Sequence, residues 1–306
     1  MPTTNLILLV LPKVHLLDLA GADQVFYEAL DYGLDIKVSY CSYGAALQTS
    51  TNIGLAPLRH FSEIAIKAGD YLIIPGSETS FLGGPEMAQQ QDLFDWIVDC
   101  HAKKAILCSI CTGAFFLAMT GLLDGRKCTT HWRLTDRLRQ MFPKINVIDN
   151  ILFTEDDRIF TSAGVTSGID LALHIIAKIK DDQVSYKIAR ELVVYNRRSG
   201  HDAQHSIHLK YRNHIHSGVH KIQDWLQEKI DKKMVLDDLA ELACMSTRNM
   251  TRVFKKETGI TINDYIFLLR KEKIRELLKN PNLSRRDIAE QCGLKSERQV
   301  GRILRN

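Results

Sequence analysis

Cys108-Ser-Ile-Cys-Thr-Gly-Ala-Phe-Phe-Leu-Ala118 is the stretch of the sequence in which a predicted strand passes into a predicted helix. Residues 104–109 have the length and apolar content of a short buried strand, and residues 113–121 have the small side chains of a closely packed helix. A tight turn between such elements directs its central side chain into a cleft, as in a nucleophile elbow. Two alternatives follow for Cys111: it is a catalytic nucleophile, or it is the floor of a pocket that senses a ligand.

The alternation of strand and helix patterns extends over the first 180 residues. Short runs rich in Ile, Leu and Val predict strands at 6–11, 34–41, 71–74, 105–108 and 159–161, and helical spacing predicts helices at 19–30, 86–103, 112–121, 132–142 and 168–180. This alternation favours an α/β fold with a mostly parallel sheet and helices on both faces. Ligands bind beyond the carboxyl ends of such strands, where we expect three loops: 12–18, 75–78 and the turn at Cys111.

The overall composition is that of a globular protein and argues against a membrane-spanning, exported or disulfide-bonded protein. The 306 residues are enough for two or three domains, and 45% are hydrophobic and 25% charged. No run of about 18 apolar residues predicts a membrane span. The apolar start lacks a preceding positive charge, so we interpret it as a first strand and not as a signal peptide. Seven cysteines without disulfide-like spacing predict free thiols and a cytoplasmic protein.

Charge is divided unevenly along the chain. From His201 onwards there are 21 Lys and Arg against 14 Asp and Glu, which leaves 19 against 22 in the first 200 residues. A basic final third on a mildly acidic body indicates a nucleic-acid-binding module. A Lys-rich solvated surface is the alternative explanation.

A polar joint separates the two parts. Residues 182–198 predict a helix, and residues 197–218, rich in Ser, Gly, His and Arg, predict an interdomain linker. Six histidines lie between His201 and His220, but a flexible polar stretch does not fix coordination geometry, so we expect no metal site.

The final third predicts two helix-turn-helix units. Segments 235–256 and 283–304 resemble each other, and each begins with an expected polar cap and carries Ala240 or Ala289 where two helices cross closely. A helix at 262–279 joins them, so the two second helices can read adjacent major grooves about 34 Å apart.

The first part resembles the PfpI-like branch of the class I glutamine-amidotransferase-like superfamily. The resemblance covers about residues 5–180 and is carried by five ordered motifs: 10–26, Asp70-Tyr-Leu-Ile-Ile-Pro-Gly76, Ser109-Ile-Cys-Thr-Gly-Ala114, 121–132 and 161–172. It implies a flavodoxin-like sheet sandwich over residues 1–196 that senses a ligand. The ligand-binding residues carried over are Asp18, Gly76, Cys111, Thr112 and His131.

The same resemblance bears on catalysis. Protease-like members have a histidine directly after the cysteine, where this chain has Thr112, so we expect no catalytic residues. The helix after Cys111 and backbone N–H groups would favour a thiolate. His131 either pairs with Cys111 or caps the helix near Trp132, and Asp18 either faces the thiol or caps the helix at 19. A branch similar to isonitrile hydratases also has Cys-Thr at this turn. Trp132 is expected in the core, with a pocket wall as the alternative.

Residues 219–306 resemble an AraC/XylS-type DNA-binding domain. The carriers include Arg252-Val-Phe-Lys-Lys-Glu-Thr-Gly259 and Asp287-Ile-Ala289. Base-facing candidates carried over are Arg248, Thr251, Arg252, Glu297, Arg298, Gln299 and Arg302, since Arg pairs with guanine and Gln with adenine. Cys244 occupies a turn position where the family often has Gly, so a strained first turn is expected. The family usually continues past residue 306 with a closing helix, so DNA affinity is expected to depend mainly on the first unit.

These features together predict a sequence-specific transcriptional regulator. The expected partners are double-stranded promoter DNA, a small-molecule effector such as an amino acid or amine, a second copy of the chain in a homodimer, and RNA polymerase; no cofactor, metal or membrane is expected. One alternative is a cysteine-dependent hydratase or amidohydrolase fused to a DNA-binding module. Another is a scaffold with a vestigial pocket.

Overall fold

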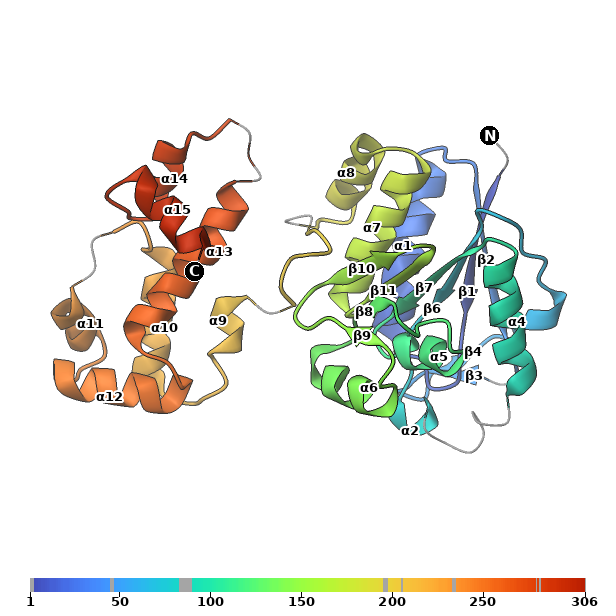
Figure 1. Ribbon diagram of the computed structural model, residues 1–306, viewed down its shortest axis with the longest axis horizontal. Coiled ribbons are helices and arrows are strands. Elements are labelled where there is room, and N and C mark those ends of the chain that lie inside the picture. Colours follow the sequence, from blue (N-terminus) through green and yellow to red (C-terminus); the bar gives the residue numbers. More distant parts are fainter. Residues whose placement is uncertain are drawn as a thin grey trace. The chain divides into compact units, whose positions relative to one another are not determined.

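The computed structural model describes residues 3–44, 47–82, 90–194, 198–204, 206–232, 235–278, 280 and 282–305. The chain divides into two compact units, residues 1–204 and 205–306, which are described separately (Figure 1). The division falls inside the stretch 197–218 that was predicted as a linker. In the described residues no helix is both long and apolar enough to cross a membrane.

A seven-stranded sheet forms the centre of the first unit. Its order is β10-β11-β7-β6-β1-β2-β5, and all neighbours are parallel except β10 and β11. The strands are β1 (Thr4–Leu9), β2 (Ile36–Ser42), β5 (Arg59–His60), β6 (Tyr71–Ile74), β7 (Ile106–Ile110), β10 (Phe153–Asp156) and β11 (Ile159–Ser162). Two further pairs are β3 (Leu47–Gln48) with β4 (Gly54–Leu55), and β8 (Lys127–Cys128) with β9 (Asn146–Val147). The predicted, mostly parallel α/β sheet is confirmed.

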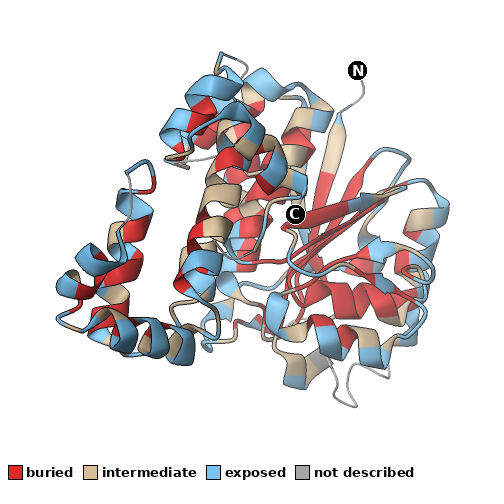
Figure 2. Cartoon of the chain, turned by 60° about the vertical axis from the view of Figure 1, so that its left-hand side comes forward, coloured by how far each residue is buried: buried red, intermediate tan, exposed pale blue. Residues whose placement is uncertain are grey.

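Helices cover both faces of this sheet because its inner strands are apolar on both sides. One core cluster joins the sheet to α1 (Leu16–Asp31), α7 (Thr166–Ile179) and α8 (Asp182–Glu191). The other joins it to α4 (Gln91–Ala102), α5 (Gly113–Met119) and α6 (Thr135–Met141). The buried residues of Figure 2 follow the strands and the inner helix faces. Along β1 and the residues after it, side chains alternate between the clusters: Leu6, Leu8 and Val10 in the first, Ile7, Leu9 and Leu11 in the second.

Several predicted boundaries differ from the structure. Helix α1 begins at Leu16, so Asp18 lies in its first turn and does not cap it; the N-cap is His15. Helix α8 ends at Glu191, because Val193 adopts a positive φ of 54° that a helix does not tolerate. The predicted helix 86–103 begins at Gln91, and residues 83–89 lie outside the described part. Two short elements were missed: α2 (Thr79–Leu82) and the 3₁₀ helix η1 (Phe61–Glu63). The predicted helix 132–142 is divided into a 3₁₀ helix, η2 (Trp132–Leu134), and α6.

The second unit is helical, as predicted. Its described helices are α9 (Ile207–Lys210), α10 (Ser217–Glu228), α11 (Leu236–Leu242), α12 (Thr247–Thr258), α13 (Ile262–Leu277), α14 (Arg285–Gln291) and α15 (Glu297–Arg305). Part of the predicted linker is therefore helical. Helix α13 serves both cores: Tyr265 and Leu269 pack with α10 to α12, and Ile274 packs with α14 and α15.

The caps and turns of the two helix-turn-helix units differ. Ser284 forms a capping box with Asp287 at α14, but Val235 supplies no side-chain cap at α11, so the polar cap expected there is absent. Both turns place one residue in the left-handed region: Cys244 at φ 53° and Gly293 at φ 63°. Glycine adopts this conformation without strain, whereas cysteine does not, so the strain expected at Cys244 is observed.

Candidate functional site

Cys111 lies at the turn between β7 and α5, with a positive φ of 56°. Its backbone N–H donates to the carbonyl of Ser162 at 2.9 Å, and its own carbonyl accepts the hydroxyl of Thr130 at 2.7 Å. A cysteine adopts left-handed backbone angles only where its surroundings stabilise them, and these two hydrogen bonds do so. The turn therefore fixes the direction of the thiol.

Two glycines allow the backbone to approach Cys111 closely. A Cβ on Gly76 would lie 2.5 Å from Asp18 Oδ2 and 2.9 Å from Cys111 Cβ, and a Cβ on Gly164 would lie 2.1 Å from Cys111 Cβ. Asp18, Gly76, Cys111, Thr112 and Gly164 thus converge beyond the carboxyl ends of β1, β6, β7 and β11, and we call them the Cys111 site. The three loops predicted to meet here do meet, and a fourth after β11 joins them.

Asp18 is a buried carboxyl group that faces Cys111. Its Oδ1 accepts the backbone N–H of Val165 at 2.5 Å, and the carboxyl group also forms a side-chain hydrogen bond with Cys111. Burial raises the pKa of Asp18, opposed by the Val165 N–H and by the charge of His15. The carboxyl group therefore links the start of α7 to the Cys111 turn.

The thiol of Cys111 is not activated as a nucleophile. Burial raises its pKa well above the ordinary value, and the nearby Asp18 charge raises it further, while the Thr112 N–H opposes them. The thiol is therefore protonated at neutral pH. The backbone N–H of Thr112 favours a thiolate as expected, but burial and the Asp18 charge outweigh it.

The side chains of Thr112 and His131 form hydrogen bonds to nearby backbone groups. The buried hydroxyl of Thr112 donates to the Ser77 carbonyl at 2.6 Å and accepts the Ser77 N–H at 2.8 Å. His131 caps η2, its Nδ1 accepting the N–H of Arg133 at 3.4 Å. Capping, one of its two predicted roles, is therefore observed. Trp132 is 46% exposed, so the expectation that it lies in the core is wrong.

Sequence reasoning missed His15, Thr130 and Gly164. His15 lies three positions before Asp18, and this spacing alone could have indicated that the two side chains lie close together. Thr130 and Gly164 reach Cys111 only through the tertiary fold. Over the residues with described structure, no group of three or more His, Cys, Asp or Glu side chains is arranged to hold a metal ion.

The second helix of the first helix-turn-helix unit presents a basic face. Ser246 caps α12, and Met250 and Phe254 bury its inner side. Arg248, Thr251, Arg252 and Lys255 recur at helical spacing on the exposed side and line a depression of about 500 Å³ that contains no carboxylate. This shape and charge fit a phosphate-lined groove.

The corresponding surface of the second unit is mixed in charge. Glu297, Arg298 and Arg302 are exposed on α15, and a depression of about 690 Å³ beside them also contains Glu290. Gln299 is half-buried, and its side-chain oxygen accepts the backbone N–H of Lys295 at 2.7 Å. The side-chain oxygen of Gln299 is therefore already used in a hydrogen bond to the backbone of the same unit.

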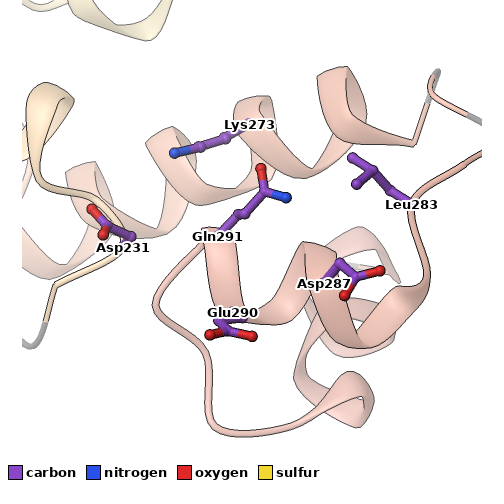
Figure 3. A pocket seen from close by; sticks show the side chains of 6 residues that line it. All are labelled: Asp231, Lys273, Leu283, Asp287, Glu290 and Gln291. Carbon is purple, nitrogen blue, oxygen red and sulfur yellow. The ribbon is translucent and has the colours of Figure 1, made fainter.

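A third depression, of about 590 Å³, lies beside α13 and α14 (Figure 3). Asp231, Asp287 and Glu290 line it with a single ammonium group, that of Lys273. Three carboxylates against one cation repel phosphate, so the depression beside α12 is the better candidate for a nucleic-acid interface.

Comparison with known proteins identifies two regions. Residues 5–178 match the model of the DJ-1/PfpI family, and residues 239–306 match that of a helix-turn-helix domain. Two curated relatives from Pseudomonas aeruginosa are the HTH-type transcriptional regulators GbdR (29% identical over 200 residues, 64% of this chain and 53% of that protein) and CdhR (28% over 242 residues, 78% and 70%). The chain spans about half the length of GbdR.

Two further relatives complete the comparison. The isonitrile hydratase of Pseudomonas putida is 32% identical over 172 residues, which are 56% of this chain and 70% of that enzyme. The crystal structure of an AraC family transcriptional regulator from Pseudomonas putida has a TM-score of 0.54 at 20% identity and covers 62% of this chain and 99% of that chain. This last likeness concerns the fold alone.

Proposed function

Because the chain belongs to the DJ-1/PfpI family and also carries an AraC-type helix-turn-helix domain, as its sequence predicted, we propose that it is a transcriptional regulator that binds promoter DNA in response to a small molecule. The observation that carries the proposal is the outward face of α12, where Arg248, Thr251 and Arg252 are exposed on a helix whose other face is buried. Side chains so placed reach base edges in a major groove.

The effector in this proposal binds at the Cys111 site and is an amine or an amino acid. Asp18 supports this class, because it places a buried carboxyl group, the natural partner of an ammonium ion, beside the Cys111 thiol. An ammonium group beside it would lower the pKa of Asp18 and compensate the cost of burying its charge.

Regulation requires the effector to bind two conformational states with different affinity. A homodimer would present its recognition helices to repeated half-sites, as the symmetry of two-fold assemblies requires. RNA polymerase is the partner through which promoter binding would change transcription.

Selection of duplexes from a random library by the full chain tests the DNA-binding part. We expect enrichment of one sequence family at about 150 mM salt, bound at least about 10³-fold more tightly than random duplex, as is typical of specific binding. Repeating the measurement with small amines and amino acids identifies the effector as the compound that changes the Kd. Equal affinity for selected and random duplex would remove the proposal.

A cysteine-dependent hydratase is a second candidate, supported by the likeness to isonitrile hydratase. The raised pKa of Cys111 opposes it, because a protonated thiol is a weak nucleophile. We expect Cys111→Ala to retain DNA binding within about 3-fold, a change of less than 1 kcal/mol. Hydration of a simple alkyl isonitrile by the unmodified chain, lost in Cys111→Ala and retained in the Cys244→Ala control, would instead support the enzyme.

A further inference from the structure

The last residues of the first unit, 198–204, are bound tightly to it, and we call them the exit segment. The carbonyl of Gly200 accepts the N–H groups of Leu152 at 2.9 Å and Phe153 at 3.2 Å, and the carbonyl of Asp202 accepts Leu152 N–H at 3.0 Å. A Cβ on Gly200 would lie 2.7 Å from the Phe153 carbonyl oxygen, so the backbones are in direct contact. This segment immediately precedes the DNA-binding unit in the chain.

The first residue of the exit segment is held by the helix that begins at the Cys111 site. Arg198 donates from Nε and Nη2 to Asp170 Oδ2, at 3.1 and 2.6 Å, and from Nη2 to Thr166 Oγ1 at 2.9 Å. The Asp170 side chain is only 3% exposed, so the ion pair is largely buried on that side. Thr166 is the first residue of α7 and directly follows Val165, whose N–H donates to Asp18.

The last residue of the exit segment is held by the residues that support Cys111. Gln204 Nε2 donates to the carbonyls of Thr130 at 3.1 Å and Ile151 at 3.0 Å, and its Oε1 accepts the N–H of Trp132 at 2.9 Å. Thr130 is the residue whose hydroxyl holds the Cys111 carbonyl. Both ends of the exit segment are therefore a short chain of bonds away from the Cys111 site.

We propose that the exit segment is a regulatory strap that transmits the state of the Cys111 site to the DNA-binding unit, through Arg198 at one end and Gln204 at the other. The proposal rests on the proposed function. A ligand that moves Asp18 or the Cys111 turn changes the start of α7 and the position of Thr130, and each change alters a bond that holds the strap. In this proposal, the bonded segment and the released segment are the two states that coupling between sites requires.

Amide hydrogen exchange on the full chain tests the link without DNA or effector. Asp18→Ala removes the acceptor of the Val165 N–H, and we expect exchange at Arg198, Leu152 and Phe153 to become at least 5-fold faster. Asp31→Ala, at the exposed end of the same helix, is the matched control and should change these rates by less than 2-fold. Rates in Asp18→Ala that equal those of the control would overturn the proposal.

The reverse direction provides a second variant, because Asp18→Ala can destabilise the fold. Gln204→Ala is expected to speed modification of Cys111 by methyl methanethiosulfonate at least 3-fold, read by peptide mass mapping. Gln91→Ala, which removes one exposed bond to Asp95, is the control. An unchanged rate at Cys111 in Gln204→Ala would show that the strap does not report on this site.

A double-mutant cycle on DNA affinity then separates this proposal from the proposed function. With a duplex selected by the unmodified chain, we expect Asp18→Ala to change the Kd at least 5-fold, and less than 2-fold in the Gln204→Ala background. An equal change in both backgrounds, or none in either, rejects the proposal that the exit segment is a regulatory strap. It does not contradict the proposal that the chain is a transcriptional regulator. Failure of the unmodified chain to select any duplex rejects the proposed function, and the exchange and thiol measurements still decide on the strap.

Discussion

Replacing Arg248 and Arg252 together by alanine is expected to weaken binding of the full chain to its selected duplex by at least about 30-fold. Each bidentate pair of arginine with guanine contributes about 1–3 kcal/mol of discrimination, and about 2 kcal/mol in total corresponds to this factor. Both side chains are exposed on α12, and Met250 and Phe254 hold the opposite face of that helix in the core. The substitutions should leave the fold intact. The measurement is a titration of labelled duplex at fixed salt.

Two controls assign the effect to base contacts. Arg137→Ala with Arg190→Ala removes the same charge from exposed positions of the first unit and should change the Kd by less than about 3-fold, a fraction of one base contact. Lys255→Ala with Lys256→Ala should weaken binding to selected and random duplexes alike and lower the salt dependence by about two phosphate contacts. If the arginine pair behaved like the lysine pair, with unchanged preference for the selected sequence, α12 would not be the reading helix.

The layered sheet could be predicted because its signal is local. Buried parallel strands are continuous apolar runs, and the helices that cover them repeat every three to four residues, so five of the seven strands were located before the fold was known. The two strands that were not predicted, β10 and β5, lack this local signal. β10 is the antiparallel edge strand, and two of its four residues are Glu155 and Asp156, so its hydrophobic signal is weak. β5 has two residues and is defined only by its pairing with β2.

The Cys111 site could be predicted in part: Gly164 and the electrostatics of the site were not predicted. Cys111 was recognised because a predicted strand passes into a predicted helix there, and Asp18 and Gly76 were carried over from the family resemblance. The pKa of the thiol depends on burial and on the distance to Asp18, and neither quantity is encoded at neighbouring positions. For a related reason the sequence does not reveal that the side-chain oxygen of Gln299 accepts the backbone N–H of Lys295; the base-facing role of Gln299 stays a prediction.

Gly164→Ala is expected to destabilise the first unit by about 2–4 kcal/mol. The new Cβ would lie 2.1 Å from Cys111 Cβ and 2.7 Å from Cys111 Cα, and Gly164 has a φ of 84° that alanine adopts only with strain. Overpacking costs about 1–3 kcal/mol and the left-handed conformation about 1 kcal/mol more. For a unit of this size the midpoint of thermal unfolding should fall by about 4–16 °C, measured by circular dichroism or calorimetry.

Gly121→Ala is the matched control because it isolates the conformational part of this cost. Gly121 has a φ of 76°, but a Cβ there would meet no atom within 4 Å. We therefore expect a loss of about 1 kcal/mol from the strain alone. Cys111→Ala should not rescue Gly164→Ala, because alanine keeps the Cβ with which the new methyl group collides. Equal losses in Gly164→Ala and Gly121→Ala would mean that the loop after β11 can move away from Cys111. In that case Val165 would not be held in place for its bond to Asp18, and the coupling of the Cys111 site to α7 would lose its structural basis.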